Sequence, residues 1–234
     1  MRRCLAAGMF FCSVSCALAG DISTNRVAQN EGVSSIQTGK PTERAHMSEV
    51  AVGDHWNYDV RDEIAGTALP TRNVIVTDIS GGQVATRVDV GNCRSGSMVF
   101  DKSWNILRDG ANRYSPNSGT GVQLPLKLNA EWKTAADEVN GNNGNVWKIA
   151  VSSRVTGQES VTTKAGTFDT YTIETTQAVR NTKDPAANAQ VFIRTWFSPV
   201  VNHWVRRNIV RRVGGLVVFN ETVELTEYGL KNVQ

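Results

Sequence analysis

Cysteine is scarce in this sequence, and its placement excludes a disulfide-rich scaffold. Three of the four cysteines lie within the first 16 positions, and only Cys93 lies further along the chain of 234 residues. A single cysteine cannot form an internal disulfide. Cys93 follows the turn residues Gly91 and Asn92, and we expect a small packed side chain there, because a reactive thiolate requires a basic partner and a depressed pKa.

Metal-binding patterns are also lacking. The three histidines, His46, His55 and His203, have no paired spacing such as His-Glu-x-x-His, and no cysteine cluster accompanies them. We therefore expect surface or strand-packed histidines. The sequence predicts no metal site and no cofactor.

Catalytic motifs are equally sparse. The segment Gly96-Ser97-Met98 lacks the second glycine of a nucleophile elbow. Asp54 and Asp59 flank a strand, but Asp59 shares its face with polar residues, which indicates a solvated surface and not a catalytic cleft. No catalytic residue is predicted, and a hydrolase is the least favoured function.

The first 50 residues indicate export. Arg2 and Arg3, the apolar run 4–16 and the small residues 17–19 before Gly20 form a signal-peptide pattern over residues 1–19. A membrane anchor is less favoured because the run is shorter than the ~20 residues that span a bilayer. Lipoprotein processing at Cys16 is a further alternative. Residues 20–50 are polar without periodicity and predict a flexible arm before a single β domain at 51–234.

Removal of the predicted signal peptide changes the charge. The formal net charge of +3 falls to +1, because the peptide contains two arginines and no acidic residue. The basic balance therefore gives no support for nucleic-acid binding. The sequence predicts a periplasmic or secreted bacterial protein, with no transmembrane segment after signal cleavage.

Strand patterns fill the remaining chain. In residues 53–60, His55, Asn57 and Asp59 alternate with Trp56, Tyr58 and Val60, which is typical of a half-buried strand. Gly81-Gly82 predicts a two-residue hairpin turn, with Ile79 opposite Val84, Thr77 opposite Thr86 and Ile75 opposite Val88. In residues 146–155 the alternating set is Trp147, Ile149, Val151, Ser153 and Val155.

A second hairpin is predicted at Gly214-Gly215, and it carries the candidate binding residues. Pairing across this turn places Trp204 by Leu225, Arg206 by Val223, Val210 by Phe219 and Arg212 by Val217. That face is mostly apolar and is assigned to the core. Arg206, Asn208 and Glu221 fall on it, where a charge needs a partner or a wet cavity. We therefore predict Arg206, Asn208, Glu221 and Trp204 as ligand-binding residues.

A cluster of arginines on the same strand has two interpretations. Arg206, Arg207, Arg211 and Arg212 lie within seven residues. They could bind an anionic head group through bidentate hydrogen bonds. The favoured alternative is cross-strand pairing with the glutamates of the hairpin partner, which contributes roughly 0.2–1 kcal/mol per pair.

Short strands and frequent turns, without long helices, predict an all-β, antiparallel fold. The spacing of turns indicates about 8–10 strands in a strongly curved sheet or an incomplete barrel. A two-sheet sandwich is the alternative.

The chain resembles a group of bacterial secreted or periplasmic β proteins to which no function is assigned. The motifs are GDHWNY (53–58), LPLKLNAEW (124–132), AGTFDTYTIE (165–174) and WFSPVVNHWVRR (196–207). The resemblance spans roughly residues 50–230. It implies a half-barrel similar to that of lipoprotein carriers, whose concave face holds acyl chains, and it carries no catalytic residues.

Two hypotheses for function follow. The first is a non-enzymatic periplasmic envelope protein that binds an apolar or amphipathic ligand, such as a lipid, on its curved sheet. The second is a structural or interaction protein of the envelope, without a small ligand, whose arm or sheet edge binds a protein partner.

Overall fold

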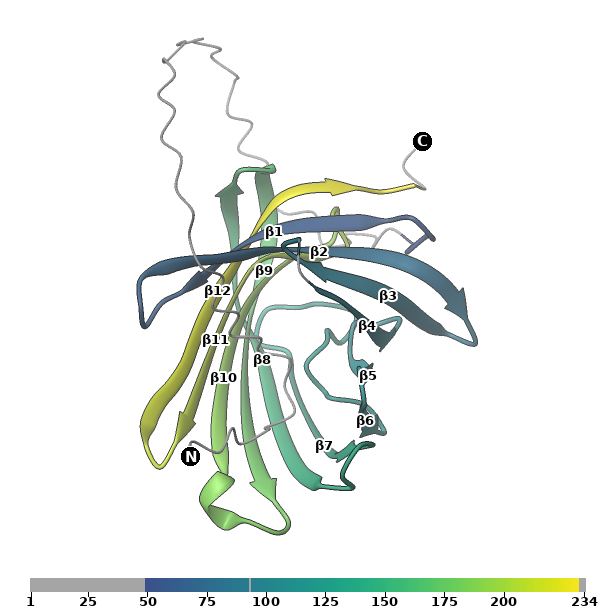
Figure 1. Cartoon of the computed structure of the whole chain (residues 1–234). Coiled ribbons are helices and arrows are strands. Elements are labelled where there is room, and N and C mark those ends of the chain that lie inside the picture. Colours follow the sequence, from purple (N-terminus) through teal and green to yellow (C-terminus); the bar gives the residue numbers. More distant parts are fainter. Residues whose placement is uncertain (1–48, 93, 232–234) are drawn as a thin grey trace, which may run out of the picture. The chain divides into compact units, whose positions relative to one another are not determined.

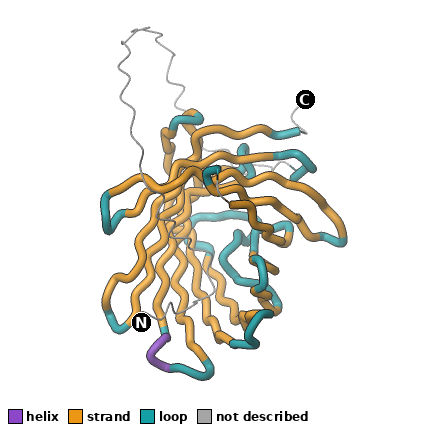
Figure 2. The backbone as a smooth tube through the Cα atoms, viewed as in Figure 1, coloured by secondary structure: helices purple, strands orange, loops and turns teal. Residues whose placement is uncertain are grey.

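Twelve antiparallel strands form one sheet that closes into a barrel (Figures 1 and 2). The computed structural model describes residues 49–92 and 94–231. The predicted signal peptide, most of the predicted arm, His46 and Cys93 lie outside them. In sequence order the strands are β1 (His55–Asp62), β2 (Thr67–Ser80), β3 (Gln83–Val90), β4 (Arg94–Asp101), β5 (Ile106–Asp109), β6 (Asn112–Ser115), β7 (Glu131–Asn140), β8 (Val146–Thr163), β9 (Gly166–Asn181), β10 (Ala189–Ser198), β11 (His203–Val213) and β12 (Leu216–Gly229).

The all-β, antiparallel prediction is confirmed, but two of its details are wrong. The barrel is closed, and it has 12 strands where about 8–10 were expected. A single sheet also replaces the alternative two-sheet sandwich. The closure depends on β5 and β6, four residues each, which connect β4 to β7. Residues 109–121 are rich in polar turn residues, a composition typical of a loop. The short strand β6 within them is therefore not predictable from composition.

The strands are arranged in two groups in Figure 1. β8–β12 lie side by side along the length of the barrel, and β1–β3 cross their upper ends in this view. The described residues contain one further element, the 3-10 turn η1 (Pro185–Ala187), in the β9–β10 connection (Figure 2). No helix among the described residues is long and apolar enough to cross a membrane. All strands lie within the predicted domain 51–234, whose boundaries remain predictions.

The alternation predicted for β1 is confirmed. Trp56, Tyr58 and Val60 are buried, whereas the residues between them are partly exposed. The same pattern holds for β8, where Trp147, Ile149, Val151, Ser153 and Val155 are all buried. Period-two alternation therefore located the inner face of both strands correctly.

The Gly81-Gly82 hairpin is also present, and its register is only partly as predicted. Ile79 lies opposite Val84, as expected. A bulge between Val76 and Asp78 then shifts the pairing, so that Val76, not Thr77, lies opposite Thr86. An inserted residue changes which side chains share a face beyond it.

The same effect corrects the Gly214-Gly215 hairpin. Arg212 lies opposite Val217, as predicted, but a bulge between Arg211 and Arg212 shifts the remaining pairs. Arg206 therefore lies opposite Glu224 instead of Val223. A one-residue shift moves every following side chain to the other face. Arg206 and Asn208 consequently do not lie on the core face, and Arg207 and Arg211 replace them there.

The connection between β6 and β7 packs against the inner face of the barrel. Ser118, Gly119, Gly121 and Val122 are buried. A Cβ atom at Gly119 would overlap the hydroxyl of Thr134 on β7, and one at Gly121 would overlap backbone atoms of residues 103–105. Only glycine allows such a close approach of two segments. The barrel interior is thus filled partly by its own loop.

Candidate functional site

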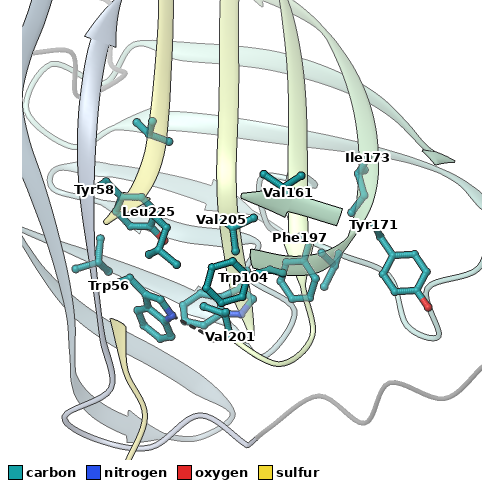
Figure 3. Close-up of a cluster of buried hydrophobic side chains, with 14 of the residues drawn as sticks. Trp56, Tyr58, Trp104, Val161, Tyr171, Ile173, Phe197, Val201, Val205 and Leu225 are labelled. Carbon is teal, nitrogen blue, oxygen red and sulfur yellow. Dashed lines mark hydrogen bonds between the residues drawn. The ribbon is translucent and has the colours of Figure 1, made fainter. Parts of the chain in front are cut away.

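Aromatic side chains fill the interior beside this loop (Figure 3). The imidazole of His203 stacks on Trp56, with ring centroids 4.5 Å apart, and it meets the edge of Trp104 at 4.6 Å. Trp56 donates a hydrogen bond from Nε1 to the carbonyl oxygen of Val201 at 3.1 Å. His203 is therefore a core residue, in agreement with the strand-packed histidine that the sequence indicates.

Tyr58 hydrogen-bonds to His203. Its hydroxyl lies 2.5 Å from Nδ1 of His203 and donates to the carbonyl oxygen of Trp204 at 3.1 Å. Burial holds the pKa of His203 well below its usual value and, despite two nearby arginines, raises the pKa of Tyr58 well above its own. Both groups are thus neutral at neutral pH, and the pair is a structural contact.

The space left next to these aromatic rings is very small. The cavity has a volume of about 10 Å³ and is lined by Trp104, Thr120, Gly121, Val122, Ile173, Thr195, Phe197 and Trp204. That volume is at the lower limit for a single water molecule. An acyl chain does not fit at this level of the barrel, so the expected apolar ligand on the concave face has no room here.

Two of the four predicted binding residues point inward. Trp204 is half-buried, with its ring 3.6 Å from that of His203 and the guanidinium of Arg207 4.6 Å from its centroid. Glu221 is buried and accepts a hydrogen bond from Arg72 at 3.0 Å. The placement of Glu221 on the core face is confirmed, and its charge is paired.

The other two predicted residues lie on the opposite face. Arg206 forms an ion pair with Glu224 and donates from Nε at 2.8 Å, which agrees with the cross-strand pairing favoured for the arginine cluster. Asn208 donates to the side chains of Asn220 and Thr222. The four predicted residues therefore do not converge on one site.

Arg207 is one of two inward arginines of β11 that were not among the predicted binding residues. Its Nη2 donates to the carbonyl oxygen of Thr120 at 3.3 Å, and no acceptor among the described residues lies within reach of its buried Nε. Burial lowers the pKa of Arg207 to about 10, with a smaller contribution from nearby Arg72. The bulge at Val218 of β12 sets the register that places Arg207 inward, and the sequence contains no pattern that predicts this bulge.

The acid-base pair considered from the sequence does not form. Asp54 is buried and accepts hydrogen bonds from the backbone N–H groups of Ala51 and Lys231, at 2.8 and 2.7 Å. Asp59 instead forms an exposed ion pair with Lys164 at 2.6 Å. Within residues 49–92 and 94–231, no group of three or more His, Cys, Asp or Glu side chains could hold a metal ion.

A polar groove of about 700 Å³ lies on the strands at the start of the domain. It is lined by Asn57, Thr71, Arg72, Asn73, Arg87, Asp89, Gly91, Asn92, Ser95 and Thr226. Asn57, Asn73, Asp89 and Ser95 lie opposite one another across β1, β2, β3 and β4. In β1, Asn57 alternates with the buried Trp56 and Tyr58, so this row occupies the outer face of the sheet. We call this hollow the outer groove.

Two amide oxygens of the outer groove lack protein partners. The Oδ1 atoms of Asn57 and Asn73 are buried, and no donor among the described residues lies within hydrogen-bond distance of either. The Nδ2 of Asn57 donates to Glu227 at 3.1 Å, which fixes the orientation of its amide. A buried acceptor without a donor costs roughly 1–3 kcal/mol. Each oxygen has almost no exposed surface, so it can accept from a ligand only after its side chain moves toward the groove.

The charges of the outer groove compensate each other. Asp89 accepts hydrogen bonds from Ser95 at 2.5 Å and from Nε of Arg87 at 3.0 Å. The Ser95 hydrogen bond is the main reason that the pKa of Asp89 lies below its usual value, and the carboxylate is ionised. Arg72 is paired with Glu221. The groove thus offers hydrogen-bonding groups without a large excess charge.

Sequence reasoning placed Asn57 correctly on the outer face but did not identify the groove. Alternation in β1 reveals the face. The hollow itself depends on how several strands curve relative to one another, and most of its lining residues are distant from Asn57 in sequence. A row of amide and hydroxyl residues at one level of several predicted strands was the only available signal.

Two solved structures are similar in fold. A predicted lipoprotein from Parabacteroides distasonis aligns with a TM-score of 0.50 and 15% sequence identity, over 79% of this chain and 99% of that chain. A predicted exported protein from Bacteroides fragilis, described as having a YmcC-like fold, aligns with a TM-score of 0.50 and 11% identity, over 80% of this chain and 100% of that chain. No protein-family model matches the sequence, and no curated protein matches it significantly. The similarity concerns the fold alone.

Proposed function

We propose that this chain is an exported, non-enzymatic protein of the bacterial envelope that binds a neutral, hydroxyl-rich ligand in the outer groove. The signal-peptide pattern at residues 1–19 supports export. The fold likeness to proteins described as a lipoprotein and as an exported protein supports an envelope location. The carboxylates considered for catalysis, Asp54 and Asp59, have structural contacts instead.

The single observation that carries this proposal is the pair formed by Asn57 and Asn73. The two residues lie directly opposite each other on β1 and β2, and both buried Oδ1 atoms lack a donor among the described residues. Side chains of directly opposed residues are about 4.5–5.5 Å apart at Cβ. Once the two side chains move toward the groove, two acceptors at this spacing would suit a ligand that presents two neighbouring hydrogen-bond donors.

The other groups of the outer groove favour hydroxyls over charged donors. A hydroxyl donates and accepts, so it can use the amide oxygens as well as the N–H groups of Arg87 and Asn92 that border the same hollow. An ammonium ion would accept no hydrogen bond and would approach Arg87. A carboxylate would compete with Asp89, which already receives two hydrogen bonds.

This proposal replaces an apolar ligand within the barrel. The cavity beside the aromatic rings holds about 10 Å³, and the inner loop occupies the neighbouring space. The outer groove, at about 700 Å³, has the size of an ordinary small-molecule site.

Nuclear magnetic resonance of the ¹⁵N-labelled exported chain tests the proposal. The protein is titrated in parallel with a panel of neutral oligosaccharides and with the diamine cadaverine. We expect at least one oligosaccharide to shift the amide signals of residues 57, 73 and 89, and cadaverine to leave them in place. Shifts from cadaverine alone would assign the groove to amines and refute the hydroxyl-rich ligand.

Two variants make the test specific. Asn73→Leu removes one acceptor and fills part of the groove, and it should weaken binding at least tenfold. Asn142→Leu changes an exposed asparagine of the β7–β8 turn and should leave binding unchanged. Equal binding by wild type and Asn73→Leu, or no shifts with any oligosaccharide, would overturn the proposal.

A further inference from the structure

The tip of the β11–β12 hairpin exposes consecutive apolar side chains. Leu216, Val217 and Val218 are 73%, 40% and 53% exposed. They follow the turn Gly214-Gly215, where a Cβ atom added to either glycine would meet no other atom within 4 Å, so open space surrounds the turn. None of these residues lines the outer groove, and an inference from the tip is independent of the proposed function.

The apolar residues lie on both faces of the hairpin. Successive side chains of a strand point to opposite faces, so Leu216 and Val217 lie on different faces. Val218 is the extra residue of a bulge, because Val217 pairs with Arg212 and Phe219 pairs with Arg211. Phe192 of β10, which is 40% exposed, pairs with Val210 next to this hairpin and extends the apolar surface. A flat partner would cover only one face, whereas a medium that surrounds the tip would cover both.

The Gly81-Gly82 hairpin is an internal reference for this comparison. It has the same glycine pair at its turn, and its exposed neighbours are polar: Thr77, Asp78, Ser80 and Gln83. A glycine-glycine hairpin of this barrel therefore does not require an apolar tip. The composition of residues 216–218 needs a separate reason, since exposed apolar runs mark interaction sites.

Basic side chains border the tip. Arg212, next to the turn, is exposed, and so are Arg180 and Lys183 on the neighbouring end of β9 and the loop after it. Residues 207–220 contain no acidic residue. Two exposed acidic side chains lie nearby: Asp184 caps η1 through the N–H of Ala186, and Glu63 pairs with Arg61. The three cations outnumber the unpaired carboxylate of Asp184, so the net charge at this end is positive.

We propose that this hairpin tip inserts into the surface of an anionic lipid bilayer and docks the barrel there. Leu216, Val217 and Val218 would enter the boundary between head groups and acyl chains, while Arg212, Arg180 and Lys183 contact lipid phosphates. Apolar insertion combined with cationic contacts is the usual physics of interfacial membrane binding. Figure 1 shows that the tip and the β9–β10 connection lie at the same end of the barrel, so both can face one surface.

Vesicle cosedimentation tests the docking. The chain, purified as its host exports and processes it, is mixed with vesicles of phosphatidylglycerol and phosphatidylethanolamine, or of phosphatidylcholine alone. We expect binding to the anionic vesicles to exceed binding to phosphatidylcholine at least tenfold, and to weaken as salt is added.

The decisive variant is the double substitution Leu216→Ser/Val218→Ser, which we expect to reduce binding at least tenfold. The matched control is Val200→Ser, because Val200 is 65% exposed at the opposite end of β10 and β11. Circular dichroism establishes that both variants are folded. The substituted side chains of the double variant are exposed, so the fold should tolerate them. Arg212→Glu provides a second measurement: it reverses one charge, leaves the apolar residues in place and should also weaken binding.

Three results would overturn the proposal. They are absence of wild-type binding to anionic vesicles, equal binding by wild type and the double variant, and self-association of the wild type through the tip without vesicle binding. The last result, measured by analytical ultracentrifugation, would assign the tip to a contact between two copies. None of these results bears on ligand binding in the outer groove, so failure of the two proposals can be distinguished.

Discussion

The hydroxyl of Tyr58 lies 2.5 Å from Nδ1 of His203, although the two residues are 145 positions apart in the chain. The contact joins β1 to β11 across β12. The ring of His203 stacks on Trp56, and the ring of Tyr58 stacks on Trp204. Because Tyr58 donates its proton to the carbonyl oxygen of Trp204, it can accept one from His203. A single hydroxyl thus satisfies two buried polar groups on β11.

Replacement of that hydroxyl should destabilise the barrel. In Tyr58→Phe both groups on β11 lose their partner, and each unsatisfied buried group costs about 1–3 kcal/mol. We expect the free energy of unfolding, measured with urea, to fall by at least ~1 kcal/mol. Tyr228→Phe is the control, since it keeps the ring contact with Phe168 and should change stability little. Equal effects of the two substitutions would contradict a special role for the Tyr58 hydroxyl.

Removal of one charge from the ion pair of Arg72 and Glu221 is a second test. The side chains are 26% and 5% exposed, and Arg207 is a further cation in their surroundings. In Glu221→Gln the two arginines would face each other without a carboxylate. Loss of one partner of a buried pair typically costs about 3–5 kcal/mol, and the partial exposure of Arg72 places our expectation near the lower value.

The neighbouring pair provides the control. Glu224 lies on β12, as Glu221 does, but it binds Arg206 of β11, and both side chains are about one-third exposed. Surface pairs contribute roughly 0–1 kcal/mol, so Glu224→Gln should be nearly neutral. If Glu224→Gln were the more damaging substitution, the assignment of Arg206 to the outer face would be wrong.

These two glutamates also mark what the sequence could reveal. Composition and turn spacing predicted an antiparallel all-β chain, and alternation identified Trp56 and Tyr58 as core residues. Both Gly-Gly turns were located, and the pairs next to them were correct. Local hydrogen bonding and side-chain alternation determine these features, so the nearby sequence contains the necessary information.

The interior of the barrel could not be predicted in the same way. One extra residue in β12, Val218, shifts the pairing of β11, so that Arg207 and not Arg206 lies on the core face. Either arginine looks the same in the sequence, and the choice depends on packing against β10 and β12. The outer groove has the same origin, since Asn57 and Asn73 become a paired site only through the register of β1 and β2.

Gly119 allows the inner loop to be tested. Gly119 and Gly144 have nearly the same backbone angle, with φ of +69° and +67°, so alanine incurs the same conformational cost at each, about 1–2 kcal/mol. At Gly144 the added methyl meets open space, whereas at Gly119 it would overlap Thr134. Overpacking adds typically 1–3 kcal/mol, so Gly119→Ala should be the more destabilised variant by that amount.

Hydrogen exchange identifies where the damage occurs. The N–H of Val122 donates to the carbonyl oxygen of Ser103 at 2.8 Å and should exchange faster in Gly119→Ala if the loop is displaced. The same amide should be unchanged in Gly144→Ala. Equal stability of the two variants would show that the loop has room for a methyl group and that the interior is less filled than described.

A buried carboxyl group in the barrel wall should make stability depend on pH. Glu138 on β7 is buried next to Tyr114, with Asp109 and Arg211 nearby. Burial, with a smaller contribution from Asp109, raises the pKa of Glu138 from its usual 4.5 to about 7. The folded protein therefore retains this proton to a higher pH than the unfolded chain does. The contribution of Glu138 to the free energy of unfolding is largest below pH ~4.5. It declines as the pH rises from 4.5 to about 7 and is smallest above pH 7.

Glu138→Gln removes this titration while preserving the shape of the side chain. We expect variant and wild type to unfold with similar free energies near pH 4.5, and the variant to become relatively more stable as the pH rises to 8. The upper bound is about 3.5 kcal/mol, from a shift of 4.5 to about 7 at about 1.4 kcal/mol per unit. His203 acts with the opposite sign, because its lowered pKa costs stability as the pH falls below ~6.5. Both proteins contain His203, so its contribution cancels in the difference, and a difference that stayed constant from pH 4.5 to 8 would refute the raised pKa of Glu138.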